Sequence, residues 1–181
     1  MPSKFLILLQ LIVTAVVCAF GRNFAEEKPA VNIPAEDAKP KKLLFRGVVV
    51  PIPRALKTLG VKAYPEELKD QVALLTPENE LLPILPDWRG RAFFQDERLR
   101  DRKVELIGYR KPGLPYLQVL TIFTFDADDR RQLTDYWCDV CSIPMYEIKP
   151  CDCCQQPIRL RFQPRELPKD VQSLSKDSAE K

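Results

Sequence analysis

Short apolar runs separated by turn-forming residues dominate the centre of this sequence. These runs cover residues 43–50, 72–76, 81–85, 104–109, 117–125 and 133–137. Their β-branched and aromatic residues, and the proline, glycine and charged residues between them, predict β-strands. The second and third runs flank the turn-forming residues 77–80, which predicts a hairpin.

One helical pattern interrupts the strands. Residues 92–99 combine phenylalanine and leucine with charged positions, which predicts one short amphipathic helix. Residues 54–69 can form one or two short helical turns, but Gly60 and Pro65 interrupt them, so this segment is expected to be a surface insertion and not a long helix. The order of three strands, a short helix and further strands predicts a mainly-β fold, with a small five-stranded OB-like barrel at residues 43–135. Another kind of small β-barrel is the alternative.

The N-terminus carries an export pattern. Lys4 precedes an apolar run at residues 5–20, and small residues stand at Ala19 and Gly21. The run is shorter than the roughly 20 apolar residues of a spanning helix, so residues 1–21 are predicted to be a signal peptide. An uncleaved anchor at residues 5–20 is the alternative. Either one places the domain outside the cytoplasm, periplasmic or secreted, with membrane contact only through this segment.

Polar segments flank the predicted folded part. Residues 22–42 are rich in proline, alanine, glutamate and lysine, which predicts a disordered tether. Residues 166–181 lack apolar periodicity and are expected to form a disordered tail. Between the barrel and this tail, residues 136–165 are expected to form a cysteine-rich lobe packed on the barrel.

Charge and composition exclude several kinds of chemistry. The sequence contains no histidine, which removes histidine-based acid–base catalysis and histidine metal ligands. The formal net charge of +3 is too small to require a nucleic-acid partner. No catalytic constellation is apparent, so a non-enzymatic role is expected.

A basic, aromatic-containing stretch is the one feature that suggests nucleic acid. Its cations are Arg89, Arg91, Arg98, Arg100, Arg102 and Lys103. Acidic residues such as Asp96, Glu97 and Asp101 alternate with these cations, which favours a salt-bridged surface over a nucleic-acid site.

Two C-x-x-C pairs lie near the end of the predicted folded part. Cys138 is paired with Cys141, and Cys151 with Cys154. Two residues between ligands allow a tight turn to direct both sulfurs at one ion. Two such turns supply four thiolates, so these cysteines are the predicted ligands of a structural zinc ion in a knuckle-like lobe.

The cysteine pattern leaves alternatives to zinc open. Knuckles often have glycine after the second cysteine, where this chain has Ser142 and Gln155. Disulfides would form readily in an oxidising compartment, and a redox-active dithiol or iron–sulfur binding is a further alternative. Asp139 and Asp152, inside the pairs, are expected to raise the thiol pKa, which disfavours a catalytic thiol. Cys153 is left over as a spare cysteine. Trp137, next to Cys138 in the sequence, is expected to cover the sulfurs.

The stretch Tyr136-Trp137-Cys138-Asp139-Val140-Cys141, continuing to Cys151-Asp152-Cys153-Cys154, resembles an uncharacterised family of exported bacterial proteins. Residues 104–110 and 117–120 are similar to strands of the same family. The resemblance covers residues 44–165 and implies no activity.

Taken together, these features predict an exported, non-enzymatic binding or assembly module with a structural zinc site and a protein or small-molecule partner. An extracytoplasmic thiol redox or metal-handling protein is the alternative function. Residues 51–70 depart from the resembled family, which is consistent with an insertion there.

Overall fold

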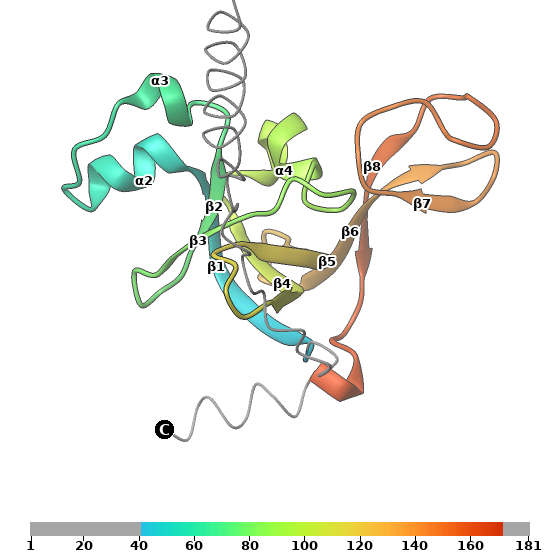
Figure 1. Cartoon of the computed structure of the whole chain (residues 1–181). Coiled ribbons are helices and arrows are strands. Elements are labelled where there is room, and N and C mark those ends of the chain that lie inside the picture. The colour runs from blue at the N-terminus through green and yellow to red at the C-terminus, as the bar shows by residue number, and fades with distance from the viewer. Residues whose placement is uncertain (1–40, 172–181) are drawn as a thin grey trace, which may run out of the picture. The chain divides into compact units, whose positions relative to one another are not determined.

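Eight strands form one antiparallel sheet in the part of the chain that the computed structural model describes, residues 41–171 (Figure 1). The strands are β1 (Leu43–Pro51), β2 (Val72–Leu75), β3 (Leu81–Pro83), β4 (Lys103–Arg110), β5 (Leu117–Phe125), β6 (Arg131–Cys138), β7 (Ile143–Met145) and β8 (Arg159–Pro164). Short helical segments accompany them: α2 (Ile52–Thr58), α3 (Pro65–Leu68), α4 (Ala92–Gln95) and the 3-10 turn η1 (Glu97–Leu99). The mainly-β fold is therefore confirmed.

Two predictions fall largely outside the described residues. The signal peptide or anchor within residues 1–21 lies wholly outside them. The tether expected at residues 22–42 is described only at Lys41 and Lys42, which are exposed. Within residues 41–171, no helix is both long enough and apolar enough to cross a membrane.

The sheet combines two series of neighbouring strands that meet at β1. β3, β2 and β1 are neighbours in that order, and the other edge of β1 pairs with β4, which is followed by β5, β6 and β7. The OB-like five-stranded barrel is not confirmed, because the sheet does not close. Among the described residues, a single parallel bridge between Ile84 and Leu117 joins the end of β3 to the start of β5. Pro83 ends β3 and has no backbone N–H to donate, which limits pairing there.

The helices outnumber the single short helix that the sequence predicted. α4 and η1 occupy the expected residues 92–99, and α2 and α3 are short helical segments in the connection between β1 and β2, where the sequence allowed one or two helical turns. Pro51 and Pro53 mark the end of the first strand, and proline is well tolerated in the first turn of a helix. α2 begins in this way and buries Ile52 and Ala55.

The sheet and the cysteine-rich lobe share one hydrophobic core. Its fully buried residues from the sheet and α4 include Val49, Leu74, Phe93 and Leu106. Met145 of β7, in the lobe, is packed into the same core and is 2 % exposed. The lobe therefore packs against the sheet through this common hydrophobic core.

β6 crosses the boundary that was expected at residues 135–136. Its first half pairs with β5, its end pairs with β7, and β8 pairs along its length from Gln132 to Trp137. Figure 1 shows β6 leading from the sheet into the loops that carry the cysteines. The barrel and lobe expected from the sequence therefore share one continuous strand.

The folded part extends beyond its expected end at residue 165. Leu167 and Val171 are 8 % and 1 % exposed, and they pack with Ile107 and Phe123 in a second small core. Val171 lies in a short helical turn, in which its amide donates to the carbonyl of Pro168 at 3.0 Å, and Leu167 lies just before this turn. Two isolated apolar residues in a proline- and lysine-rich segment gave too weak a pattern to predict this packing. Residues 172–181 of the expected tail lie outside the description.

Candidate metal centre

The structure brings together the four cysteines predicted as ligands. The Sγ atoms of Cys138, Cys141, Cys151 and Cys154 all lie within 4.8 Å of one another, and Cys138 and Cys154 are 3.5 Å apart. With Zn–S bonds of about 2.3 Å, a tetrahedral site separates its sulfurs by about 3.8 Å. This cluster of four cysteines could therefore hold one metal ion.

Two parts of the chain supply the sulfurs. Cys138 ends β6, and Cys141 lies in the turn that leads into β7. Cys151 and Cys154 belong to the loop between β7 and β8. Cys138 and Cys151 are fully buried, whereas Cys141 and Cys154 are partly exposed. The first cysteine of each pair thus lies inside the lobe and the second lies toward its surface.

The two turns repeat the same hydrogen bonds from backbone to sulfur. The amide of Cys141 donates to Cys138 Sγ at 3.4 Å, and the amide of Val140 donates to the same sulfur. In the second turn, the amides of Cys153 and Cys154 donate to the sulfur of Cys151. Hydrogen bonds of this kind stabilise the thiolate form, which is the form that binds metal.

Both turns end with the same backbone conformation, although neither has glycine after its second cysteine. The amide of Ser142 donates to the carbonyl of Cys138 at 2.8 Å, and that of Gln155 donates to the carbonyl of Cys151 at 2.9 Å. Ser142 and Gln155 have φ angles of 54° and 59°. Both residues adopt the left-handed backbone that glycine usually provides. Both turns therefore adopt this backbone conformation without glycine.

The thiol pKa values differ within the cluster. The amides of Cys154 and Cys153 lower the pKa of Cys151 to about 7. The amide of Cys141 also lowers that of Cys138, but burial and the neighbouring thiols outweigh it and raise the pKa of Cys138. Contacts with Cys153 and Cys154 raise the pKa of Cys141. A bound cation would favour ionisation of all four thiols.

Asp139 and Asp152 were expected to raise the pKa of the thiols. This is wrong for Cys151, whose pKa is lowered. Arg159 of β8 donates two hydrogen bonds to Asp139, at 2.8 and 2.9 Å. Lys149 pairs with Asp152 at 3.0 Å. These cations offset the acidic charges inside both pairs. Nothing in the spacing of the cysteines indicated either partner.

Trp137 does not cover the sulfurs, because neighbouring residues of a strand point to opposite faces. Cys138 lies on one face of β6 and Trp137 on the other. The ring of Trp137 lies under the guanidinium of Arg161, which is 3.5 Å from the ring centroid. Arg161 also binds the buried Asp135 through two hydrogen bonds, at 2.9 and 2.6 Å. This group fastens β8 to β6 beside the cysteines.

Polar contacts hold the lobe against the sheet and α4. Tyr136 donates to the buried Asp96 at 2.6 Å, and the amide of Ile148 donates to Gln95 Oε1 at 2.8 Å. Trp88 also meets Tyr146 edge-on, with ring centroids 5.2 Å apart. The position of the cysteine loops is thus fixed from both sides of β6.

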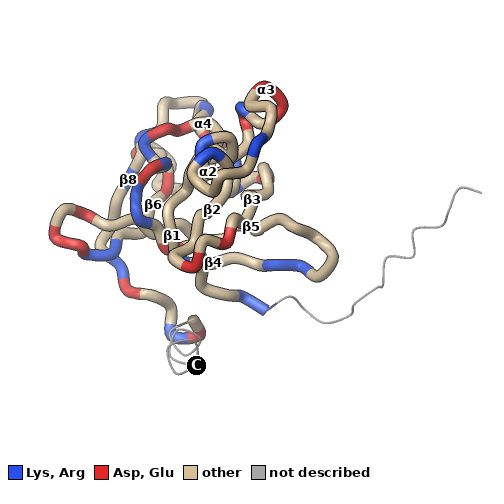
Figure 2. The backbone as a smooth tube through the Cα atoms, turned by 90° about the vertical axis from the view of Figure 1, so that its left-hand side faces the viewer, with Lys and Arg blue, Asp and Glu red and all other residues tan. Residues whose placement is uncertain are grey.

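The basic stretch has its charges bound within the chain. Three of its cations pair with carboxylates, as Arg91–Glu147, Arg98–Asp96 and Lys103–Asp129. The other three donate to backbone carbonyl groups, and these are Arg89, Arg100 and Arg102. Figure 2 shows acidic and basic positions interspersed over the molecule. Of the acids that alternate with these cations, Asp96 pairs with Arg98 and Asp101 pairs with Arg54, which lies outside the stretch.

The donor set limits what this centre can do. With no histidine in the sequence, all four ligands available within 4.8 Å are sulfurs, which suit a soft ion such as zinc. Four protein ligands complete a tetrahedral site and leave no position for substrate. No protein-family model, curated protein or solved structure matches this chain. Any functional assignment therefore rests on the residues themselves.

Proposed function

We propose that this chain is an exported, non-enzymatic binding or assembly module whose lobe is locked by a zinc ion on Cys138, Cys141, Cys151 and Cys154. The matched pair of turns carries the proposal. Each turn directs two amides at the sulfur of its first cysteine and places a left-handed residue after its second. Two such turns facing each other supply the four thiolates of one tetrahedral zinc site.

Zinc explains the cluster better than disulfides do. A disulfide joins sulfurs in pairs, whereas here four sulfurs converge on one point. The amides near these sulfurs stabilise a negatively charged thiolate, whereas a sulfur in a disulfide carries no such charge. The support for zinc is thus the arrangement of all four groups together.

An OB-type barrel is part of the proposal. The single bridge between Ile84 and Leu117 brings the ends of β3 and β5 together in parallel. α4 lies between β3 and β4 in the chain, and OB barrels are often only partly closed. Export is proposed from the apolar run at residues 5–20 and its small flanking residues.

One observation favours a thiol redox or metal-handling protein as the second candidate. Cys153 is exposed and contacts Cys141, so a fifth thiol lies beside the four. Cys151, with a pKa of about 7, would be partly ionised near neutral pH. An accessible extra thiol could exchange with a ligand or with another thiol.

Alkylation kinetics separate the two candidates. Purified protein is treated with iodoacetamide, with and without a zinc chelator, and the modified cysteines are identified by mass spectrometry. A locked structural site predicts rapid labelling of Cys153 alone, with the four ligands labelled only after chelation. Rapid labelling of a C-x-x-C pair before chelation would instead favour the redox or metal-handling protein.

A further inference from the structure

Cys153 occupies the place in the second cysteine turn that Val140 occupies in the first. The two turns read Cys-Asp-Val-Cys and Cys-Asp-Cys-Cys. The amides of Val140 and Cys153 each donate to the sulfur of the first cysteine in their own turn, so the two backbones are equivalent here. Because the first turn forms with valine at this place, neither the turn nor the set of four ligands requires a sulfur there. The thiol of Cys153 is therefore available for another role.

The thiol of Cys153 lies beside a ligand that belongs to the other turn. It is within hydrogen-bond reach of the thiol of Cys141. Cys153 is exposed and Cys141 is partly exposed, whereas Cys138 and Cys151 are buried. An oxidant in solvent therefore reaches Cys153 most easily, and Cys141 is the ligand placed to react with it next. Cysteines that sense oxidants share these two properties, exposure and a neighbouring thiol that completes a disulfide.

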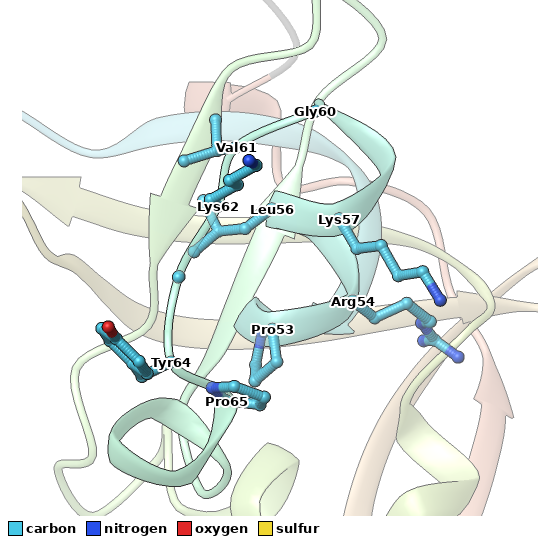
Figure 3. A pocket seen from close by; sticks show the side chains of 10 residues that line it. Pro53, Arg54, Leu56, Lys57, Gly60, Val61, Lys62, Tyr64 and Pro65 are labelled. Atoms are coloured by element: carbon cyan, nitrogen blue, oxygen red, sulfur yellow. The ribbon is translucent and has the colours of Figure 1, made fainter.

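The hollows of the described surface indicate what kind of molecule reacts with Cys153. Three of these hollows are lined without any cysteine. One of them, of about 850 Å³, lies between α2 and α3, and its lining side chains contain no sulfur (Figure 3). A bulky substrate needs a concave surface beside the reacting atom. None of these three hollows adjoins Cys153, whose exposed thiol therefore suits a small oxidant such as hydrogen peroxide.

We propose that Cys153 is a peroxide-sensitive modification site whose oxidation releases the metal ion. This inference rests on the proposed zinc site. The peroxide oxidises the sulfur of Cys153: the O–O bond breaks, a sulfenic acid forms and water leaves. The sulfur of Cys141 then attacks the sulfur of Cys153, so that an S–S bond forms, the S–O bond breaks and hydroxide leaves. Overall, the two sulfurs lose two electrons and the peroxide gains them.

The new disulfide removes one ligand from the metal. Only the sulfurs of Cys138, Cys151 and Cys154 then remain, whereas a closed structural zinc site has four protein ligands. The affinity for zinc falls and the ion leaves. The lobe loses its lock, and because the lobe and the sheet share β6 and a common core, the stability of both decreases. Reduction of the disulfide restores the fourth ligand.

Treatment of the whole zinc-bound protein with stoichiometric hydrogen peroxide tests the proposal. A fluorescent zinc indicator follows metal release, and peptide mass spectrometry identifies the oxidised cysteines. We expect zinc to be released together with formation of a disulfide between Cys141 and Cys153. In a second sample, dimedone should trap a sulfenic acid on Cys153. A first disulfide that does not contain Cys153, or zinc release with Cys153 still reduced, would overturn the proposal.

Cys153→Val is the decisive variant, because it gives the second turn the sequence of the first. The fold and the zinc content should therefore be retained. Release of zinc by peroxide should be at least about tenfold slower than in the wild type, since the exposed thiol that reacts first is gone. Val140→Ala is the matched control: it changes the equivalent side chain of the first turn, which is 70 % exposed, and removes no sulfur. This control should release zinc at the wild-type rate.

Zinc content before treatment separates this inference from the zinc site itself. If wild type and Cys153→Val both contain zinc and release it at equal rates, the role of Cys153 is refuted and the zinc site stands. If neither untreated protein contains zinc, the zinc site and the release step are refuted. In that case the disulfide found by mass spectrometry still decides whether Cys141 and Cys153 form a redox pair.

Discussion

Ser142 and Gln155 occupy the same place in the two cysteine turns, and both have a left-handed backbone. That conformation costs an ordinary residue about 1–2 kcal/mol, whereas glycine adopts it freely but loses more entropy on folding. Ser142→Gly and Gln155→Gly should therefore each stabilise the protein by about 0.5–1 kcal/mol. Urea unfolding of the metal-bound protein measures this change.

Ser142→Ala is the control for that prediction. Alanine removes the hydroxyl but keeps the Cβ atom that disfavours a left-handed backbone. We expect no gain in the free energy of unfolding from this variant. A gain from alanine equal to that from glycine would show that the side chain, and not the backbone, sets the stability of the turn.

Glu105 links the pH dependence of stability to a buried ion pair. Its carboxylate accepts hydrogen bonds from Arg131 at 2.6 Å and Arg46 at 2.9 Å, and its side chain is 6 % exposed. Burial alone would raise the pKa of Glu105, but the two arginines outweigh it and lower the pKa below its ordinary value. The folded state therefore releases this proton more readily than the unfolded chain does.

A lowered pKa gives a definite sign to the pH dependence. The stabilisation is complete above the unfolded pKa of about 4.3 and is lost as the pH falls through the lower folded value. Glu105→Gln should cost about 1–3 kcal/mol at pH 7, and the difference from wild type should shrink at pH values below about 4. Urea unfolding at both pH values checks this. Both proteins carry the same cysteines, so metal loss in acid largely cancels in the comparison, and a difference that grows in acid would contradict the prediction.

Among the elements, the strands from β1 to β6 could be predicted from the sequence, whereas β7 and β8, which flank the cysteine loop, could not. β1, β4 and β5 carry the β-branched and aromatic runs that the sequence shows plainly. β7 has three residues with Pro144 at its centre. β8 alternates with Arg159 and Arg161, whose aspartate partners lie far away in the sequence. Apolar periodicity cannot detect strands held by such long-range pairs.

In the candidate site, too, one part could be predicted from the sequence and another could not. The spacing of the cysteines alone identified Cys138, Cys141, Cys151 and Cys154. Their surroundings depend on contacts between distant residues, as with Arg159 and Asp139, and could not be predicted from spacing. The expected position of Trp137 over the sulfurs was wrong, although strand alternation alone places Trp137 and Cys138 on opposite faces when both belong to one strand.

The segment after β8 gives a test at the scale of an element. Leu167 and Val171 cover Ile107 and Phe123. Ending the chain after residue 165 should destabilise it by about 3 kcal/mol or more, since fully burying one such side chain contributes about 1.5–3 kcal/mol. Ending the chain after Val171 is the control, because it keeps both buried side chains and should therefore melt at a higher temperature than the chain that ends after residue 165. Equal melting temperatures for the two shortened chains would show that the segment does not stabilise the fold.

For the whole molecule, the lobe and the sheet should unfold together. β6 runs through both, Met145 is packed in the common core, and Tyr136 binds Asp96 across them. Removing a metal that binds only the folded state lowers its stability by mass action. A zinc chelator should therefore lower the melting temperature of a single transition, followed by far-ultraviolet and tryptophan signals together. Separate transitions for the two signals would mean that the lobe folds independently.

The metal content of the purified native protein tests the central claim most directly. Elemental analysis should find about one zinc ion per chain, because Cys138, Cys141, Cys151 and Cys154 form one four-sulfur site. Cys151→Ser should lose that zinc, whereas Cys153→Ser should retain it. A metal-free native protein whose intact mass shows two disulfides would contradict the account.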